Sequence, residues 1–279
     1  MGTIYKTEHG AEVIRQHYRA GLDAWPVPAE QVRIPTRAGE TFVVVSGPPD
    51  APPLVLLHGS GANATMWLGD IATWATDFRV YAVDLIGEPG GSAPARPPLG
   101  SAAYALWLDE VLTGLGVDQF SLVATSLGGW FALDYVTRRP GRVTKLVLLC
   151  PGGIGAQTMG WLPKALLLRL FGRRGARRTA RLVTGLNSPD TEAALDHVVR
   201  TFAAFNPRTE RLPLFPDDQL RGIAMPLLVL VGDRDVMFDS AATAARVRRC
   251  VPRATVRVLP DVGHAILGQT TPIAEFLRT

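Results

Sequence analysis

Cysteine is scarce in this sequence. The 279 residues include two, Cys150 and Cys250, which lie far apart along the chain. Two distant cysteines give neither a disulfide framework nor the ligand spacing of a zinc site, so we interpret both as small core residues. Long apolar runs are lacking as well: residues 1–20 mix charged and apolar side chains, which predicts neither a secretory leader nor a transmembrane span. We therefore expect a cytoplasmic protein.

A strong excess of charge of one sign is also absent. The chain has 29 basic and 25 acidic residues, a net charge of +4, and its arginines are not interleaved with aromatic residues in a stripe. Because nucleic-acid binding needs such a basic footprint, no nucleic-acid partner is expected. With 47% hydrophobic and 19% charged residues, the composition is typical of a globular protein. The length suits one large α/β domain, or a core with an inserted smaller domain.

Short apolar, β-rich runs recur along the chain with helix-like segments between them. The runs cover residues 41–45, 54–57, 80–83, 120–123, 146–149, 227–231 and 255–259. The periodic segments cover residues 64–75, 102–115, 127–138 and 240–250. Since the runs are continuous rather than alternating, they predict strands buried on both faces, as in a parallel sheet between helices. The fold class is therefore expected to be α/β, with a mostly parallel, doubly wound sheet.

One connection is much longer than a normal crossover. Between the runs 146–149 and 227–231 lie two apolar helical stretches, 161–171 and 193–205, punctuated by glycine and proline. We predict an inserted helical cap over residues 152–222, on a core made of residues 1–151 and 223–279. Because ligands bind beyond the carboxyl ends of the strands in such sheets, the cap should cover the site.

A serine follows the 120–123 run at an expected strand-to-helix elbow. Ala124 and Gly128, two positions before and after Ser126, are small enough to allow a tight turn that exposes the hydroxyl. In that position the backbone N–H of Leu127 can donate to an oxyanion. The alternative interpretation of this motif alone is a serine that caps a helix.

Acyl transfer by serine also needs an imidazole, a carboxylate and a second N–H donor. Asp233 and Asp235 follow the 227–231 run, and His264 follows the 255–259 run. The loop His58-Gly-Ser60-Gly61 follows the 54–57 run, and we expect the N–H of Ser60 or Gly61 to pair with that of Leu127. His58 itself ends a buried strand, so we interpret it as structural, holding the loop through ring hydrogen bonds.

These motifs together resemble the α/β-hydrolase-fold superfamily over nearly the whole chain. They are His58-Gly-Ser-Gly, Asp84-Leu-Ile-Gly, Ala124-Thr-Ser-Leu-Gly-Gly, Gly232-Asp-Arg-Asp and Gly263-His, in the family's order. The resemblance implies a Ser126, Asp235 and His264 triad, a two-donor oxyanion hole and a helical cap. The family pattern favours Asp235 over Asp233, which would then cap its turn. Asp84 is expected to bond the backbone of its own Gly-Pro-rich loop, and Asp261 to be a turn residue.

The finer match is to the carboxylesterases, through the segment from Val83 to Gly90. Two departures stand out: Ala124 replaces the first elbow glycine, and Thr125 stands where carbon–carbon bond hydrolases have asparagine. The extra methyl group is small enough for the turn to survive. We therefore predict a serine hydrolase of carboxylic esters, thioesters or lactones, acting on a small acyl substrate with a hydrophobic moiety. No metal or organic cofactor is required for this chemistry.

The cap should set specificity, and Trp161, Leu166 and Phe202 are its candidate substrate-binding residues. The cap also carries seven basic residues. We interpret them either as a solvated helix face or as a docking surface for an acidic acyl-carrier protein or a phosphate-bearing thioester. They are Lys164, Arg169, Arg173, Arg174, Arg177, Arg178 and Arg181. The alternative function is non-hydrolytic use of the same fold: natural-product cyclisation or acyl transfer, cofactor-free perhydrolysis, or ligand sensing. The sequence does not indicate an oligomeric state.

Overall fold

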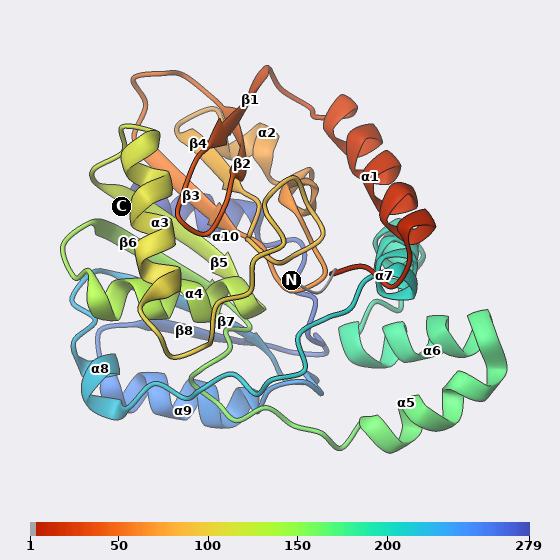
Figure 1. The fold of residues 1–279 in the computed structure, drawn as a ribbon. Helices are drawn as coiled ribbons and strands as arrows, with labels where there is room; N and C mark the ends of the chain where they lie inside the picture. The colour runs from red at the N-terminus through yellow and green to blue at the C-terminus, as the bar shows by residue number, and fades with distance from the viewer. Residues whose placement is uncertain (1–3) are drawn as a thin grey trace.

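The computed structural model describes residues 4–279 and contains one eight-stranded sheet between two layers of helices (Figure 1). The strand order is β1-β2-β4-β3-β5-β6-β7-β8. The strands are β1 (Ala29–Ile34), β2 (Thr41–Ser46), β3 (Pro53–Leu57), β4 (Arg79–Val83), β5 (Phe120–Thr125), β6 (Val143–Leu149), β7 (Leu227–Gly232) and β8 (Thr255–Leu259). From β4 to β8 all neighbours pair in parallel, whereas β2 is antiparallel to both β1 and β4.

The helices fall into a group that flanks the sheet and a group in the long connection after β6. The flanking group is α1 (Glu8–Asp23), η1 (Ala64–Trp67), α2 (Ile71–Trp74), α3 (Ala103–Gly114), α4 (Ser126–Arg138), α9 (Ser240–Cys250) and α10 (Thr270–Arg278). The connection contains α5 (Leu162–Leu168), η2 (Arg169–Phe171), α6 (Gly172–Thr184), η3 (Pro189–Thr191), α7 (Glu192–Ala204) and α8 (Asp217–Arg221).

The predicted α/β architecture is confirmed, and all seven predicted strands are present. The predicted mostly parallel sheet allows for β2, which is antiparallel to both neighbours and has all six residues buried. One detail of the prediction was wrong. β8 is a largely exposed edge strand rather than a strand buried on both faces, since it pairs with β7 alone and carries Thr255 and Arg257.

Three helical segments also differ from the prediction. The stretch 64–75 divides into η1 and α2, with Leu68, Gly69 and Asp70 between them. The helix α1 went unpredicted because its surface is mostly charged, although Ile14 and Tyr18 form a buried face. α6 went unpredicted as well, since arginine and glycine dominate its sequence and it buries little more than Gly175 and Ala180.

The sheet has a hydrophobic core on each face. On one side α3, α4 and α9 pack against the strands, with Trp107 and Trp130 fully buried. On the other side η1, α2 and α10 do so, with Trp67 and Trp74 fully buried. Burial at this scale fixes the sheet rigidly, at roughly 2 kcal/mol or more for each large apolar side chain. The carboxyl ends of β3, β5, β6, β7 and β8 consequently meet at one edge as a firm platform.

The helices of the long connection extend from that edge. In Figure 1, α5 and α6 stand out to one side of the sheet, while α7 packs against both α6 and α1. α8, by contrast, returns to pack on α9 of the core. The division into a 152–222 cap and a core of 1–151 and 223–279 stays a prediction, and residues 1–3 lie outside the described part. Within residues 4–279, none of the helices combines the length and the apolar character needed to cross a bilayer.

Candidate active site

Ser126 lies at a sharp elbow between β5 and α4. Its φ of 52° is in the left-handed region, which side chains other than glycine seldom adopt. Gly128 makes the turn compatible with close packing, because a Cβ there would meet the carbonyl oxygens of Leu57 and His58 at the end of β3. The strained backbone lifts the Ser126 hydroxyl above the sheet, at the platform described above.

Three side chains from different strand ends form a continuous hydrogen-bonded chain at this point. Nε2 of His264 lies 2.9 Å from Oγ of Ser126. Nδ1 of His264 lies 2.8 Å from Oδ2 of Asp235. Three residues far apart in sequence therefore come together in the arrangement that a serine nucleophile, its histidine base and an orienting carboxylate require.

The carboxylate of Asp235 is fixed from two sides. Oδ1 accepts hydrogen bonds from the backbone N–H groups of Met237, at 2.7 Å, and Phe238, at 3.2 Å, which leaves Oδ2 for His264. The side chain is fully buried. Asp233, in contrast, is exposed, and within residues 4–279 its carboxylate has no hydrogen-bond or ion-pair partner. Its side chain therefore does not cap the turn as expected; its backbone N–H donates to the carbonyl of Leu259 on β8, which extends the pairing of β7 with β8.

His264 lies in a mostly buried environment with Cys150 and Phe238 beside it. Burial alone would lower the pKa of the imidazolium, but the sulfur of Cys150 and the carboxylate of Asp235 outweigh it and raise the pKa above its ordinary value. Sγ of Cys150 is 4.0 Å from Nε2. The Phe238 ring lies 5.3 Å from the imidazole ring. Cys150, interpreted from sequence as a core residue, is buried but also borders the site.

Two backbone N–H groups near Ser126 have no acceptor among the described residues; they belong to Leu127, the next residue, and to Ser60, whose neighbour Gly59 lies against Ser126. Leu127 is the second residue of α4, so its N–H has no acceptor within the helix. In the described chain the N–H of Ser60 donates to no protein group. Gly61 is different, because its N–H donates to Oε2 of Glu88 at 2.7 Å. Gly61 is therefore withdrawn as an oxyanion donor, and Ser60 remains.

Glu88 is the residue of this site that the sequence analysis missed. It is fully buried, and its Oε2 also accepts a hydrogen bond from the Ser60 hydroxyl at 3.1 Å. Oε1 is buried without a partner in the part of the chain described. Burial raises the pKa of Glu88 to about 7, against the opposing effects of Gly61, Arg96, Ser60 and Arg208. A carboxylate between Gly87 and Pro89 in a loop that follows a buried strand is the signal that could have revealed it.

His58 and Asp84 fill the structural roles predicted for them. The N–H of Leu85 donates to Nε2 of His58, so Nδ1 carries the proton and donates to the Gly59 carbonyl at 2.8 Å. Asp84 accepts hydrogen bonds from the N–H groups of Ala64 and Gly91 and from the hydroxyl of Tyr18. Burial raises the pKa of Asp84 to about 6 despite these donors. Both side chains therefore hold the Ser60 loop in place.

The three predicted substrate-binding residues lie in three different environments. The Phe202 ring lies over Gly61, where a Cβ would come within 2.6 Å of it, so Phe202 borders the oxyanion loop. Trp161 precedes α5 and is partly buried. Leu166 is 66% exposed on α5. A side chain so open to solvent does not line an enclosed pocket, and we do not keep Leu166 in the site.

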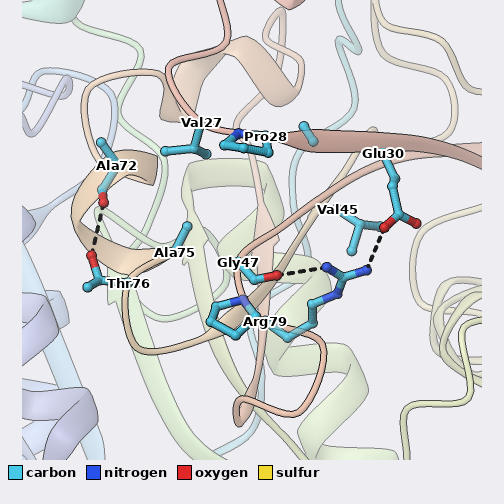
Figure 2. A pocket seen from close by; sticks show the side chains of 11 residues that line it. Val27, Pro28, Glu30, Val45, Gly47, Ala72, Ala75, Thr76 and Arg79 are labelled. Atoms are coloured by element: carbon cyan, nitrogen blue, oxygen red, sulfur yellow. Dashed lines mark hydrogen bonds and ion pairs between the residues drawn. The ribbon is translucent and has the colours of Figure 1, made fainter.

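A hollow of about 480 Å³ lies elsewhere, at the amino end of β4 (Figure 2). Its charged side chains are already engaged: Arg79 donates to the Gly47 carbonyl at 2.7 Å and pairs with Glu30 at 3.2 Å, as Figure 2 shows. The remaining lining is mostly apolar. This hollow lies at the opposite end of the strands from Ser126. Among residues 4–279, no cluster of three or more histidine, cysteine or carboxylate side chains is arranged to hold a metal ion.

Comparison with known proteins agrees with this architecture. The alpha/beta hydrolase family model matches residues 54–279. An uncharacterized carboxylesterase, nap, from Bacillus subtilis is 34% identical over 90% of this chain and 86% of its own length. Carboxylesterase YbfK from the same organism is 30% identical over 90% and 87%. The crystal structure of the B. subtilis naproxen esterase superposes with a TM-score of 0.80 at 30% identity, covering 98% of each chain. The chain therefore belongs to the alpha/beta hydrolase family.

Proposed function

We propose that the protein hydrolyses carboxylic esters through an acyl-enzyme on Ser126. The observation that carries this proposal is the chain of hydrogen bonds from Ser126 through His264 to Asp235. The backbone N–H groups of Leu127 and Ser60, which have no acceptor among the described residues, support it. The relatives described as carboxylesterases support the same class of reaction. Thioesters and lactones present the same acyl carbon and fall within the proposal.

The first half of the reaction forms the acyl-enzyme. Oγ of Ser126 attacks the acyl carbon while Nε2 of His264 takes the hydroxyl proton. Asp235 holds Nδ1–H, which fixes the tautomer and stabilises the imidazolium. The protonated Nε2 then gives its proton to the leaving alkoxide, and the alcohol departs.

The second half releases the acid. A water molecule attacks the acyl carbon, His264 takes its proton, and the bond to Oγ breaks as Oγ regains a proton from Nε2. In both halves the tetrahedral oxyanion is held by the N–H groups of Leu127 and Ser60. Removing one such donor typically costs about 10²-fold to 10³-fold in turnover.

Substrate selection is assigned to the segment that covers the site. Phe202 on α7 is 38% exposed and its ring lies over Gly61, so an exposed aromatic side chain adjoins the proposed oxyanion loop. A hydrophobic acyl or alcohol group would bury itself there. We keep residues 152–222 as the proposed cap and Trp161 as a proposed member of its lining.

The two free, buried cysteines are in keeping with a reducing cytoplasm.

Turnover of a p-nitrophenyl ester series tests the proposal. The natural chain should hydrolyse several esters with multiple turnovers and should be labelled on one serine by a fluorophosphonate probe. Ser126→Ala should lose both properties, whereas the matched variant Ser188→Ala, at an exposed position, should keep them. Ester turnover that survives in Ser126→Ala would refute the assignment. Labelling without turnover would point instead to a ligand sensor.

A further inference from the structure

The outer face of α5 and η2 exposes an unusual amount of apolar surface. Twelve large hydrophobic side chains of the described chain are exposed, and six of them lie in one short stretch that we call the apolar cap face: Met159, Leu162, Leu166, Leu167, Leu170 and Phe171. Leu170 is 80% exposed and Leu166 66%. Leu162, Leu166 and Leu170 recur every four residues, so they share one side of the helical segment. Patches of this kind mark interaction surfaces.

Basic residues surround this face. Between residues 157 and 189 the sequence has seven cations and no carboxylate, in a chain with 29 basic and 25 acidic residues. The excess positive charge of the protein is thus concentrated here. Arg177 and Arg181 are engaged with Glu192 on α7, and Arg177 also with Asp196. For the other five, no carboxylate of residues 4–279 lies within ion-pair distance; we call them the basic rim: Lys164, Arg169, Arg173, Arg174 and Arg178.

We propose that the apolar cap face and the basic rim dock the protein on an anionic phospholipid surface. Aliphatic side chains enter the boundary of the acyl chains, while arginine and lysine at the rim bind the phosphate headgroups. The positive charge also disfavours the two other occupants of such a face. A second copy would bring like charges together across a two-fold axis. An acidic protein would match the rim but would leave rows of leucine to be covered by a complementary shape.

The surface is connected directly to the candidate active site. The carbonyl of Thr184, the last residue of α6, accepts a hydrogen bond from the N–H of Ala265 at 2.8 Å. Gly185 packs against Gly263, where a Cβ on either residue would come within 2.7 Å of the other. Both contacts flank His264, so α6, which carries three of the five rim residues, ends beside the imidazole. Docking through this face would hold the active site close to the lipid surface.

Vesicle binding by the full-length Ser126→Ala variant tests the proposal without lipid hydrolysis. Because the test does not depend on turnover, its outcome is separate from that of the esterase assignment. The variant should sediment with vesicles of equal parts phosphatidylglycerol and phosphatidylcholine at low salt, and should not sediment with phosphatidylcholine alone. High salt should weaken the binding by screening the rim.

Three further variants identify the surface. Arg173→Gln, Arg174→Gln and Arg178→Gln combined should weaken binding by about 100-fold, at roughly fivefold for each charge. A matched triple variant at exposed arginines on other elements, Arg19→Gln, Arg248→Gln and Arg257→Gln, should change binding by less than about fivefold, because these charges lie on α1, α9 and β8 and not on α5, η2 or α6. Leu167→Ser with Leu170→Ser should weaken binding at every salt concentration. All these side chains are exposed, so circular dichroism and thermal unfolding should match the parent.

The proposal is overturned by any of three results. These are failure to bind phosphatidylglycerol vesicles at low salt, equal loss of binding in the rim variant and the matched variant, and a concentration-dependent dimer that the leucine variant abolishes. If the first result were accompanied by binding of an acidic acyl-carrier protein, that partner would replace the lipid surface.

Discussion

Glu88 should make the stability of this protein fall as the pH rises from about 4.5 to about 7. Its carboxyl is fully buried with one oxygen unpaired, and burial raises its pKa to about 7 from the 4.5 of an exposed glutamate. Between those two values the folded state holds a proton that the unfolded state has released. The native state is therefore favoured at the acid end of the window, and the advantage is lost as the pH passes the folded pKa.

The magnitude follows from the shift. A difference of about 2.5 pKa units at 1.36 kcal/mol each amounts to about 3 kcal/mol in the free energy of unfolding. Glu88→Gln removes the titration but keeps an amide oxygen that can accept from Gly61 N–H and the Ser60 hydroxyl. Its amide N–H2 group replaces the unpaired Oε1 and costs a constant amount at every pH.

Urea unfolding at pH 4.5 and pH 8 measures the effect as a double difference. The stability of Glu88→Gln relative to the natural chain should rise by about 3 kcal/mol between the two pH values. Glu275→Gln, which removes an exposed carboxylate on α10, corrects for the general effect of lost negative charge. A relative stability that is the same at both pH values would refute the account of Glu88 as a buried, protonated group.

Three further predictions concern the site and its supports. Asp235→Asn should reduce kcat by about 10⁴-fold and move the acidic limb of the pH–rate profile to lower pH, because it removes a carboxylate that raises the pKa of His264 and fixes its tautomer. An acidic limb at the same pH as in the natural chain would contradict this prediction. Burial, with His17 and Arg200, lowers the pKa of His197 to about 4, so the free energy of unfolding of the natural chain should fall by up to about 3 kcal/mol between pH 6.5 and pH 4. Urea unfolding of His197→Gln should show a flatter dependence on acid pH, and an equally steep loss of stability in that variant would reject the prediction. Gly128→Ala should lower the free energy of unfolding by at least about 1–3 kcal/mol and remove most of the ester turnover, because its Cβ would meet two backbone carbonyls. Thermal unfolding and a p-nitrophenyl ester assay measure the two losses.

The sequence was most informative about the buried strands and the turns at their ends. Buried strands appeared as continuous apolar runs, and their ends predicted where Ser126, Asp235 and His264 would converge. β1 and α1 were missed, because charged residues on their exposed faces hide the periodicity of the few buried positions. The edge position of β8 was missed for a related reason, since a strand's neighbours are set by chain topology rather than by its own composition.

The oxyanion loop illustrates what lay beyond the sequence. Ser60 and Gly61 were equivalent candidates as donors until the carboxylate of Glu88, 27 residues from Gly61, was found to occupy one of their N–H groups. From the sequence alone it was possible to predict which serine, aspartate and histidine follow the strand ends, and in which order, because these positions depend on local turns. Tertiary structure alone decided which N–H stays free, that Leu166 faces solvent with the apolar cap face, and that Cys150 borders His264. Those outcomes depend on contacts between segments distant in the chain, which no local pattern specifies.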